Sequence, residues 1–318
     1  MKIIVVDNVY LEEKHIQRLQ SLGDLEVYSD LPKTTHELIE RIEGADIAIV
    51  GWSQFTSDVI NKAKILKMIA IWATTCHYVD LETARVKGIV VCHCPGYGTD
   101  AVAEHTIALL LTLIRQLPET DKHVRSGKFD WRPFSSRELA GKTLGIIGTG
   151  KIGLRVAEIS KAFKMQILAY DKYPNLKKAK EIGMKYVDMP TLLKESDIIT
   201  LHVTLTVETV NLIGKKEIAA MKDGAIIINT SQGKVIDEKA LIDALQSRKL
   251  SGAGLDVFRE EPPAKDNPLF KLENTILSPH TGFHTVEAIR RKTDILIDNI
   301  VKFIEDQPQN ICQPIDLE

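Results

Sequence analysis

Short apolar runs alternate with amphipathic segments along the first hundred residues of the chain. The apolar runs lie at 3–7, 47–50, 68–72 and 89–92. Segments such as 11–22 and 36–42 lie between them and carry apolar residues at helical spacing. Because short buried strands that alternate with helices are typical of parallel sheets, this part of the chain is predicted to form an α/β unit.

A second alternating series begins at Lys142. Its predicted strands lie at 144–147, 166–170, 198–203, 225–229, 254–257 and 275–278. This number of strands suits a doubly wound sheet of the kind that binds dinucleotides. The sequence therefore predicts two parallel-sheet domains.

Two long helical patterns frame the second series. The first, at 100–117, is apolar on most sides, follows the break at Pro95-Gly96, and has Pro118 just past its expected end. The other, at 285–305, has little chain beyond it and is expected to pack back on the first unit. We therefore expect one domain from residues 1–98 with 285–318, and a second from residues 99–284.

A glycine motif follows the first strand of the second series directly. It reads Gly148-Thr149-Gly150-Lys151-Ile152-Gly153 and leads into a helical segment. Glycines at this spacing permit a tight turn, a close approach of backbone N–H groups to a pyrophosphate, and close packing of helix on strand. Asp171 ends the next strand, where a carboxylate would accept hydrogen bonds from a ribose diol and disfavour a 2′-phosphate. The sequence thus predicts a site for NAD in preference to NADP.

Composition narrows the function classes. The formal net charge of −2 offers no basic excess for nucleic acid or anionic lipid, and the longest apolar run, 107–114, is too short to span a bilayer. The first residues lack the cleavage site of a signal peptide. The cysteines show no CxxC spacing and no obvious pairing, which fits a reducing cytoplasm and gives no reason to expect a metal. They are Cys76, Cys92, Cys94 and Cys312.

Several motifs in order along the chain resemble those of the NAD-dependent D-2-hydroxyacid dehydrogenases, over essentially the whole length. Besides the glycine motif and Asp171, they lie at 201–206, 211–213, 221–230, 254–258, 261–262 and 278–280. The resemblance implies a Rossmann cofactor domain inserted into a flavodoxin-like substrate domain. It also implies a small-molecule substrate and a homodimer with the segment 102–139 at the contact.

The resemblance further implies the residues that bind NAD(H). Asp256, which ends an apolar strand, would hold the nicotinamide carboxamide. The other cofactor contacts implied outside the glycine motif are Asp171, His202, Val203, Thr204, Thr230, Ser231 and His280.

Ketone reduction needs a proton donor beside the carbonyl oxygen, because negative charge develops there as hydride arrives. His280 is the candidate for this donor. The resemblance assigns to Glu261, which precedes Pro262, the task of orienting the imidazole and favouring its protonated form.

The chain departs from the family pattern at two places that serve the substrate carboxylate. Gln232 stands where the family has a catalytic arginine, and an amide cannot replace the charged fork of a guanidinium. The family's glycine-rich substrate loop is replaced by a stretch that contains Thr74, Thr75, Cys76 and His77, which are the candidate substrate-binding residues.

Three hypotheses follow from these departures. The protein is an oxidoreductase with an atypical substrate, an ordinary 2-hydroxyacid dehydrogenase of reduced efficiency, or a catalytically weak NAD(H)-binding protein that acts through partners. The candidate catalytic residues are His280, Glu261 and Gln232, and in the first hypothesis Gln232 donates a neutral hydrogen bond to the carbonyl. Candidate replacements for the missing arginine are His77, Tyr78, Trp52 and Arg115.

Overall fold

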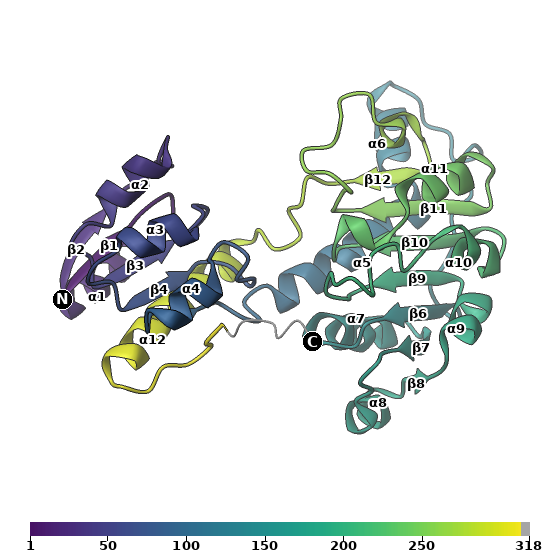
Figure 1. Ribbon diagram of the computed structural model, residues 1–318. Coiled ribbons are helices and arrows are strands. Elements are labelled where there is room, and N and C mark those ends of the chain that lie inside the picture. Colours follow the sequence, from purple (N-terminus) through teal and green to yellow (C-terminus); the bar gives the residue numbers. More distant parts are fainter. Residues whose placement is uncertain (313–318) are drawn as a thin grey trace. The chain divides into compact units, whose positions relative to one another are not determined.

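The computed structural model describes residues 1–312, which form two compact units. One unit consists of Met1–Gly98 and the described chain from Thr285 onward, and the other consists of Thr99–His284 (Figure 1). Each unit is built around its own parallel sheet, which confirms the predicted fold class.

The first unit carries five strands in the order β2-β1-β3-β4-β5, all parallel. Helices α2, α3 and α4 contribute to an apolar core on one face, and α12 contacts β4 and α1. Its strands are β1 (Lys2–Val5), β2 (Asp24–Val27), β3 (Ile47–Val50), β4 (Met68–Ile71) and β5 (Val90–Cys92). Its helices are α1 (Glu13–Leu22), α2 (Thr35–Arg41), α3 (Ser57–Lys62), α4 (Leu81–Val86) and α12 (Val286–Ile304).

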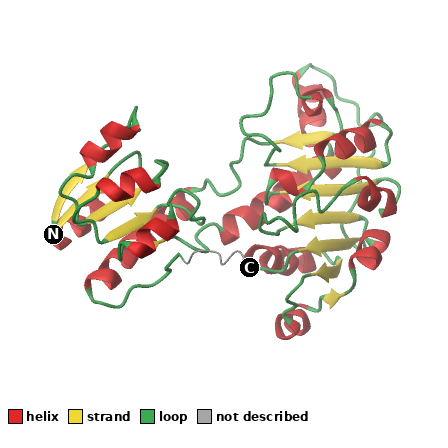
Figure 2. Cartoon of the chain, viewed as in Figure 1, coloured by secondary structure: helices red, strands yellow, loops and turns green. Residues whose placement is uncertain are grey.

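The second unit carries seven strands in the order β12-β11-β10-β9-β6-β7-β8, again all parallel, which Figure 2 shows as yellow arrows. The strands are β6 (Thr143–Ile147), β7 (Gln166–Tyr170), β8 (Lys185–Tyr186), β9 (Ile198–Leu201), β10 (Ala225–Asn229), β11 (Leu250–Leu255) and β12 (Thr275–Leu277). The helices are α5 (Thr99–Arg115), α6 (Leu117–Arg125), α7 (Lys151–Ala162), α8 (Leu176–Ile182), α9 (Met189–Glu195), α10 (Lys215–Ala220) and α11 (Glu238–Gln246). Two short 3₁₀ turns lie at Gly233–Val235 and Pro268–Lys271.

Strand β10 shows why an unbroken apolar run is needed at the centre of this sheet. Ile226 and Ile228 pack into the core with α5, α7 and α8. Ile227 packs into the opposite core with α9, α10 and α11. Both faces are therefore covered by helices, as parallel sheets require.

The long helix expected at 100–117 ends earlier than predicted. Helix α5 ends at Arg115, and Gln116 adopts a left-handed conformation with φ of 53°. Pro118 lies in the first turn of α6, where a missing N–H group costs nothing because no intrahelical partner exists there. The proline therefore lies in the first turn of a second helix and not in a loop after the first one.

Within the described residues, no helix is both long and apolar enough to cross a membrane.

Candidate functional site

The predicted cofactor and catalytic residues of the second unit follow the carboxyl ends of neighbouring strands. Gly148 follows β6, Asp171 follows β7, and His202 follows β9. Gln232 follows β10, and Asp256 follows β11. His280 comes soon after β12. Because the strands are parallel, all these ends lie along one edge of the sheet, where doubly wound proteins bind their ligands.

The glycine turn lies between β6 and α7 at the point where the strand order reverses. Gly148 has φ of 92°, and a Cβ atom there would lie 2.6 Å from the carbonyl oxygen of His202. A Cβ atom on Gly153 would collide with the carbonyl group of Gly148, so α7 packs directly on the turn. Gly150, the N-cap residue of α7, has open space where its side chain would be. The turn thus offers bare backbone and a helix N-terminus to an anion, which fits a dinucleotide pyrophosphate.

Asp171 is held in place by the glycine turn itself. Its carboxylate accepts hydrogen bonds from the Thr149 amide (2.6 Å), the Thr149 hydroxyl (2.9 Å) and the Tyr173 amide (2.8 Å). The Thr149 hydroxyl also contacts the Tyr186 hydroxyl at 2.7 Å. Burial alone would raise the pKa of Asp171, but these hydrogen bonds lower it below its ordinary value. The carboxylate is therefore ionised, and with about four acceptor positions it can still receive a ribose hydroxyl.

The remaining predicted cofactor residues differ in their burial and in their contacts with neighbouring groups. Burial lowers the pKa of His202 to about 3, so the imidazole is neutral, and its Nε2 atom lies 2.9 Å from the Thr200 hydroxyl. Val203 packs beside the core of the second unit, and the Thr204 carbonyl accepts the Thr209 hydroxyl.

The side-chain hydroxyls that follow β10 also lie within hydrogen-bond distance of protein groups. Thr230 Oγ1 lies 2.8 Å from Thr106 Oγ1 on α5, and Ser231 donates its hydroxyl to the Asn229 side chain at 2.9 Å. Their predicted contacts with the cofactor stay predictions.

The His280 and Glu261 side chains meet as predicted. The Nδ1 atom of His280 lies 2.7 Å from Oε2 of Glu261. The other Glu261 oxygen accepts the backbone N–H of Phe258 at 3.0 Å, which fixes the carboxylate relative to the end of β11. The His280 side chain is 45% exposed, so its second ring nitrogen can reach a ligand.

Asp256 holds the segment that carries His280. Its buried carboxylate accepts hydrogen bonds from the Ser278 hydroxyl and from the Thr281 and Gly282 amides, at 2.6, 2.9 and 2.8 Å. The backbone N–H of His280 donates to the Asp256 carbonyl at 2.8 Å. His280 itself has φ of 53°, a conformation that side chains other than glycine adopt at a cost. Asp256 thus stabilises a strained turn, and its predicted contact with nicotinamide stays a prediction.

His105 on α5 completes this network and was missed from the sequence. Its Nε2 atom lies 2.9 Å from Ser278 Oγ and 3.2 Å from Asp256 Oδ1. Nothing in the local pattern distinguishes it from the other polar residues of an apolar helix. Its role depends on the packing of α5 against β11 and β12, which only the fold brings together.

Gln232 follows β10 in an extended conformation. The Asn229 side chain donates to its carbonyl oxygen at 2.9 Å, so the backbone at this position is fixed. The next residue, Gly233, approaches the Phe258 carbonyl so closely that no side chain would fit. The position is therefore well defined, and the side chain that it presents is a neutral amide.

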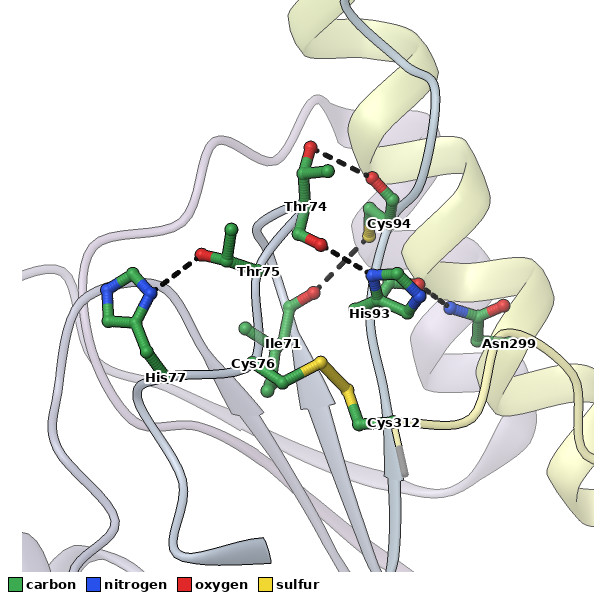
Figure 3. The surroundings of a disulfide bond; sticks show 9 residues. All are labelled: Ile71, Thr74, Thr75, Cys76, His77, His93, Cys94, Asn299 and Cys312. Carbon is green, nitrogen blue, oxygen red and sulfur yellow. Dashed lines mark hydrogen bonds between the residues drawn. A yellow bond between two sulfur atoms is a disulfide. The ribbon is translucent and has the colours of Figure 1, made fainter. Parts of the chain in front are cut away.

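The predicted substrate loop lies in the first unit, directly after β4 (Figure 3). Thr75 and His77 are joined through Oγ1 and Nδ1 at 2.8 Å, and the Thr74 carbonyl lies 2.6 Å from Nδ1 of His93. Cys76 forms a disulfide with Cys312, with Cα atoms 6.3 Å apart.

The expectation that the cysteines are unpaired is therefore wrong for Cys76 and Cys312. No local pattern indicated this pairing, because 236 positions separate the two residues. Cys92 and Cys94 are buried free thiols.

The suggested replacements for the missing arginine come from both units. His77 and Tyr78 stack with ring centroids 4.1 Å apart, and Trp52 is exposed on another loop of the first unit. Arg115 is an exposed residue at the end of α5 in the second unit.

The chain is similar to known proteins in sequence and in structure. Residues 107–282 match the family model described as D-isomer specific 2-hydroxyacid dehydrogenase, NAD binding domain. Within the matched range lie the glycine turn, Asp171, Asp256 and the His280–Glu261 pair.

Individual relatives extend the match to almost the whole chain. A glyoxylate reductase of Thermococcus litoralis is 40% identical over 312 residues, which cover 95% of this chain and 94% of that protein. A D-3-phosphoglycerate dehydrogenase of Archaeoglobus fulgidus is 39% identical over 97% of this chain, but this chain spans only 58% of that protein's length.

A solved structure of an acyclic imino acid reductase in complex with NADPH and D-Arg is also similar. It has a TM-score of 0.88 and 36% identity, and the match covers 98% of this chain and all of that one.

Proposed function

The chain belongs to the D-isomer specific 2-hydroxyacid dehydrogenase family, and from this premise we propose that it is an NAD-dependent oxidoreductase. It would transfer a hydride between NAD(H) and the carbonyl or hydroxyl carbon of a 2-oxo or 2-hydroxy acid or a related ketone. The observation that carries the proposal is the His280–Glu261 pair, which shares its sheet edge with the glycine turn.

His280 is the acid/base in this proposal. Because its Nδ1 atom faces Glu261, its Nε2 atom remains for the oxygen of the substrate. When bound, NADH supplies a hydride for the carbonyl carbon. His280 donates a proton to the oxygen as negative charge develops there, and the Glu261 carboxylate keeps the ring oriented. In the reverse direction, the same nitrogen accepts the hydroxyl proton.

The test is the turnover of His280→Ala and Glu261→Gln with hydroxypyruvate and NADH. We expect kcat of His280→Ala to fall by about a hundredfold or more, with the Kd for NADH little changed. His284→Ala, an exposed histidine of the same segment, serves as the matched control. Near-normal turnover of His280→Ala would contradict the assignment.

For the cofactor, we propose NAD in preference to NADP, because the ionised carboxylate of Asp171 would repel a 2′-phosphate. Asp171→Ala should lower the ratio of kcat/KM for NADH to kcat/KM for NADPH by roughly tenfold, since a charge-assisted hydrogen bond is worth about 1.5–3 kcal/mol. Unchanged discrimination in kcat/KM between NADH and NADPH would refute the role of this carboxylate.

A second candidate function follows from Gln232. A neutral amide binds a carboxylate less strongly than a guanidinium, so a catalytically weak NAD(H)-binding regulatory protein remains an alternative. Turnover of glyoxylate, hydroxypyruvate, pyruvate and neutral ketones by the natural protein and by Gln232→Arg separates the possibilities. Tight NADH binding without turnover of any ketone would favour the regulatory protein.

We also propose a homodimer. The segment 102–139, which the resemblance places at the contact, exposes Leu117 (52%), Val124 (55%), Phe129 (97%) and Trp131 (82%). Large apolar side chains exposed in one segment are typical of interaction surfaces. Light scattering on the purified protein and on Phe129→Ser would test this, and a monomeric natural protein would refute it.

For location, we propose the cytoplasm, without nucleic-acid or membrane partners. In a reducing compartment, Cys76 and Cys312 are expected as thiols, and their disulfide would form only on oxidation.

A further inference from the structure

A basic residue directly follows the carboxylate that is predicted to bind the ribose. Lys172 comes after Asp171 in the loop that follows β7. The Tyr173 amide donates to the Asp171 carboxylate at 2.8 Å, so the chain folds tightly at Lys172 and keeps this residue beside that carboxylate. In doubly wound proteins, a basic side chain near this position accommodates the 2′-phosphate of NADP. Lys172 would therefore oppose the preference for NAD that Asp171 creates, unless another group holds its ammonium.

Glu208 holds this ammonium. The Nζ atom of Lys172 lies 3.0 Å from Oε2 and 3.2 Å from Oε1 of Glu208, so both carboxylate oxygens face it. The hydrogen bond with Glu208 is the main reason why the pKa of Lys172 is raised above its ordinary value, so the ammonium is charged at neutral pH. The positive charge beside Asp171 is thus directed toward a second carboxylate.

Hydrogen bonds fix the backbone that carries Glu208, which lies in the loop after β9. The Thr206 amide donates to the Thr209 hydroxyl at 2.7 Å, and this hydroxyl donates to the Thr204 carbonyl at 2.7 Å. The amides of Thr209 and Val210 both donate to the Thr206 carbonyl at 3.1 Å. The loop therefore sets the position of Glu208 independently of its ion pair.

The ion pair joins the two loops that flank the glycine turn. Strand β6 lies between β7 and β9 (Figure 1), so the loops after β7 and β9 lie on either side of the turn after β6. On the β7 side, the turn donates an amide to Asp171. On the β9 side, a Cβ atom on Gly148 would lie 2.6 Å from the His202 carbonyl oxygen. Lys172 and Glu208 link the same two loops within the second unit, next to the predicted ribose site.

The pair is accessible to water and to ligands. The side chains of Lys172 and Glu208 are 61% and 67% exposed. Exposed ion pairs contribute little to folding, so the removal of Glu208 is expected to leave the second unit folded. Without this partner, the flexible lysine side chain can turn toward a phosphate monoester, which carries about 1.5 to 2 negative charges at pH 7. The ion pair therefore decides which anion the ammonium binds.

We propose that Glu208 withholds Lys172 from the 2′-phosphate of NADP and thereby strengthens the preference of this protein for NAD. This inference rests on the proposed function, because it takes the ribose site at Asp171 as given. Glu208 acts through Lys172, so it is a positioning residue for cofactor specificity and takes no part in hydride or proton transfer.

The test measures the Kd values of NADH and NADPH for the natural protein and for Glu208→Gln, from the fluorescence of the reduced nicotinamide. Glutamine keeps the length of glutamate and removes its charge. We expect the ratio of the Kd for NADPH to the Kd for NADH to fall about threefold or more, as for one surface ion pair gained. The difference between the two proteins should shrink in 1 M salt, where the Debye length is about 3 Å.

Two further variants separate the action through Lys172 from a general effect of charge. Lys172→Met combined with Glu208→Gln has no ammonium to release, so its Kd ratio should lie within about twofold of the natural value. Asp223→Asn is the matched control, because it removes the carboxylate that lies 2.7 Å from Lys249 and changes the net charge equally. Both residues of that pair precede their strands, β10 and β11, at the opposite edge of the sheet, so the Kd ratio should not change.

The outcomes distinguish this proposal from the proposed function. An unchanged Kd ratio in Glu208→Gln overturns the role of Glu208 and leaves the NAD-dependent activity standing. A lowered ratio that persists in the double variant also overturns it, because Glu208 would then act by its own charge. If the ratio falls as expected but no ketone is turned over, the proposed activity fails and the role of Glu208 stands. A natural protein that binds neither nucleotide contradicts both.

Discussion

At the level of single residues, the His280 segment shows how the proposed proton donor is held in an unfavourable backbone conformation. Its positive φ is maintained by the buried carboxylate of Asp256, which receives four hydrogen-bond donors from Ser278, Thr281, Gly282 and His105. Strain of this kind persists only where the surroundings over-determine it. Asp256 therefore fixes the position of His280, the proposed proton donor.

This network predicts a pH-dependent contribution to stability. Burial alone would raise the pKa of Asp256, but hydrogen bonds from His105, Ser278, Gly282 and Thr281 lower it below the ordinary value of 3.8. Because the pKa is lower in the folded protein, the stabilisation is complete well above pH 3.8 and is lost as the pH falls through the folded pKa.

Urea unfolding of Asp256→Asn and the natural protein measures this contribution. We expect the variant to be less stable by about 1–3 kcal/mol at pH 7, as for a broken buried hydrogen-bond network. The difference should shrink as the pH falls below 3.8. A difference that stays constant from pH 7 to pH 3 would mean that the carboxylate charge is not what stabilises the turn.

At the scale of elements, the apolar pattern predicted the buried strands well. The predicted strands 47–50, 166–170 and 225–229 coincide with β3, β7 and β10. These strands are covered on both sides, so almost every position must be apolar and the signal is strong. Strands β2 and β8 lie at the edges of their sheets and were not predicted, because half-exposed edge strands tolerate polar residues.

The turn between β6 and α7 allows a matched pair of variants. Gly153→Ala forces a Cβ atom into the Gly148 carbonyl, whereas Gly150→Ala places it in open space. We expect Gly153→Ala to lower the free energy of unfolding by about 1–3 kcal/mol, as overpacking does. Gly150→Ala should leave stability nearly unchanged and raise the Kd for NADH by about tenfold, because the methyl group fills the space for the pyrophosphate.

Thermal melting of both variants measures the effect on stability, and NADH titration measures the effect on cofactor affinity. Unchanged NADH affinity in a folded Gly150→Ala protein would show that the pyrophosphate does not lie against this turn.

At the scale of the whole molecule, the sequence predicted the class of fold and the meeting of His280 with Glu261, because motif order carries that information. It did not predict His105 beside Asp256 or Cys76 beside Cys312. Each of these pairs joins segments far apart in the chain. Such contacts depend on how helices and loops pack, and hydrophobic periodicity does not predict this packing.

The disulfide between Cys76 and Cys312 predicts a redox-dependent stability of the first unit. A disulfide that closes a long loop typically contributes about 2–4 kcal/mol to the free energy of unfolding. Cys312→Ser should therefore be less stable than the oxidised natural protein and equal to the reduced one. Thiol titration of the denatured, oxidised protein should detect only the two free cysteines, Cys92 and Cys94. Four reactive thiols in the oxidised protein would contradict the link.

The proposed function requires that this chain deliver a hydride from a bound nicotinamide to a carbonyl carbon. The most direct measurement is mass spectrometry of the product formed from hydroxypyruvate and NADH that carries deuterium at the transferred position. We expect the natural protein to form a hydroxy acid heavier by one mass unit, and His280→Ala to form it at least a hundredfold more slowly. Product without the label, or no product from any of the tested ketones while NADH binds, would contradict it.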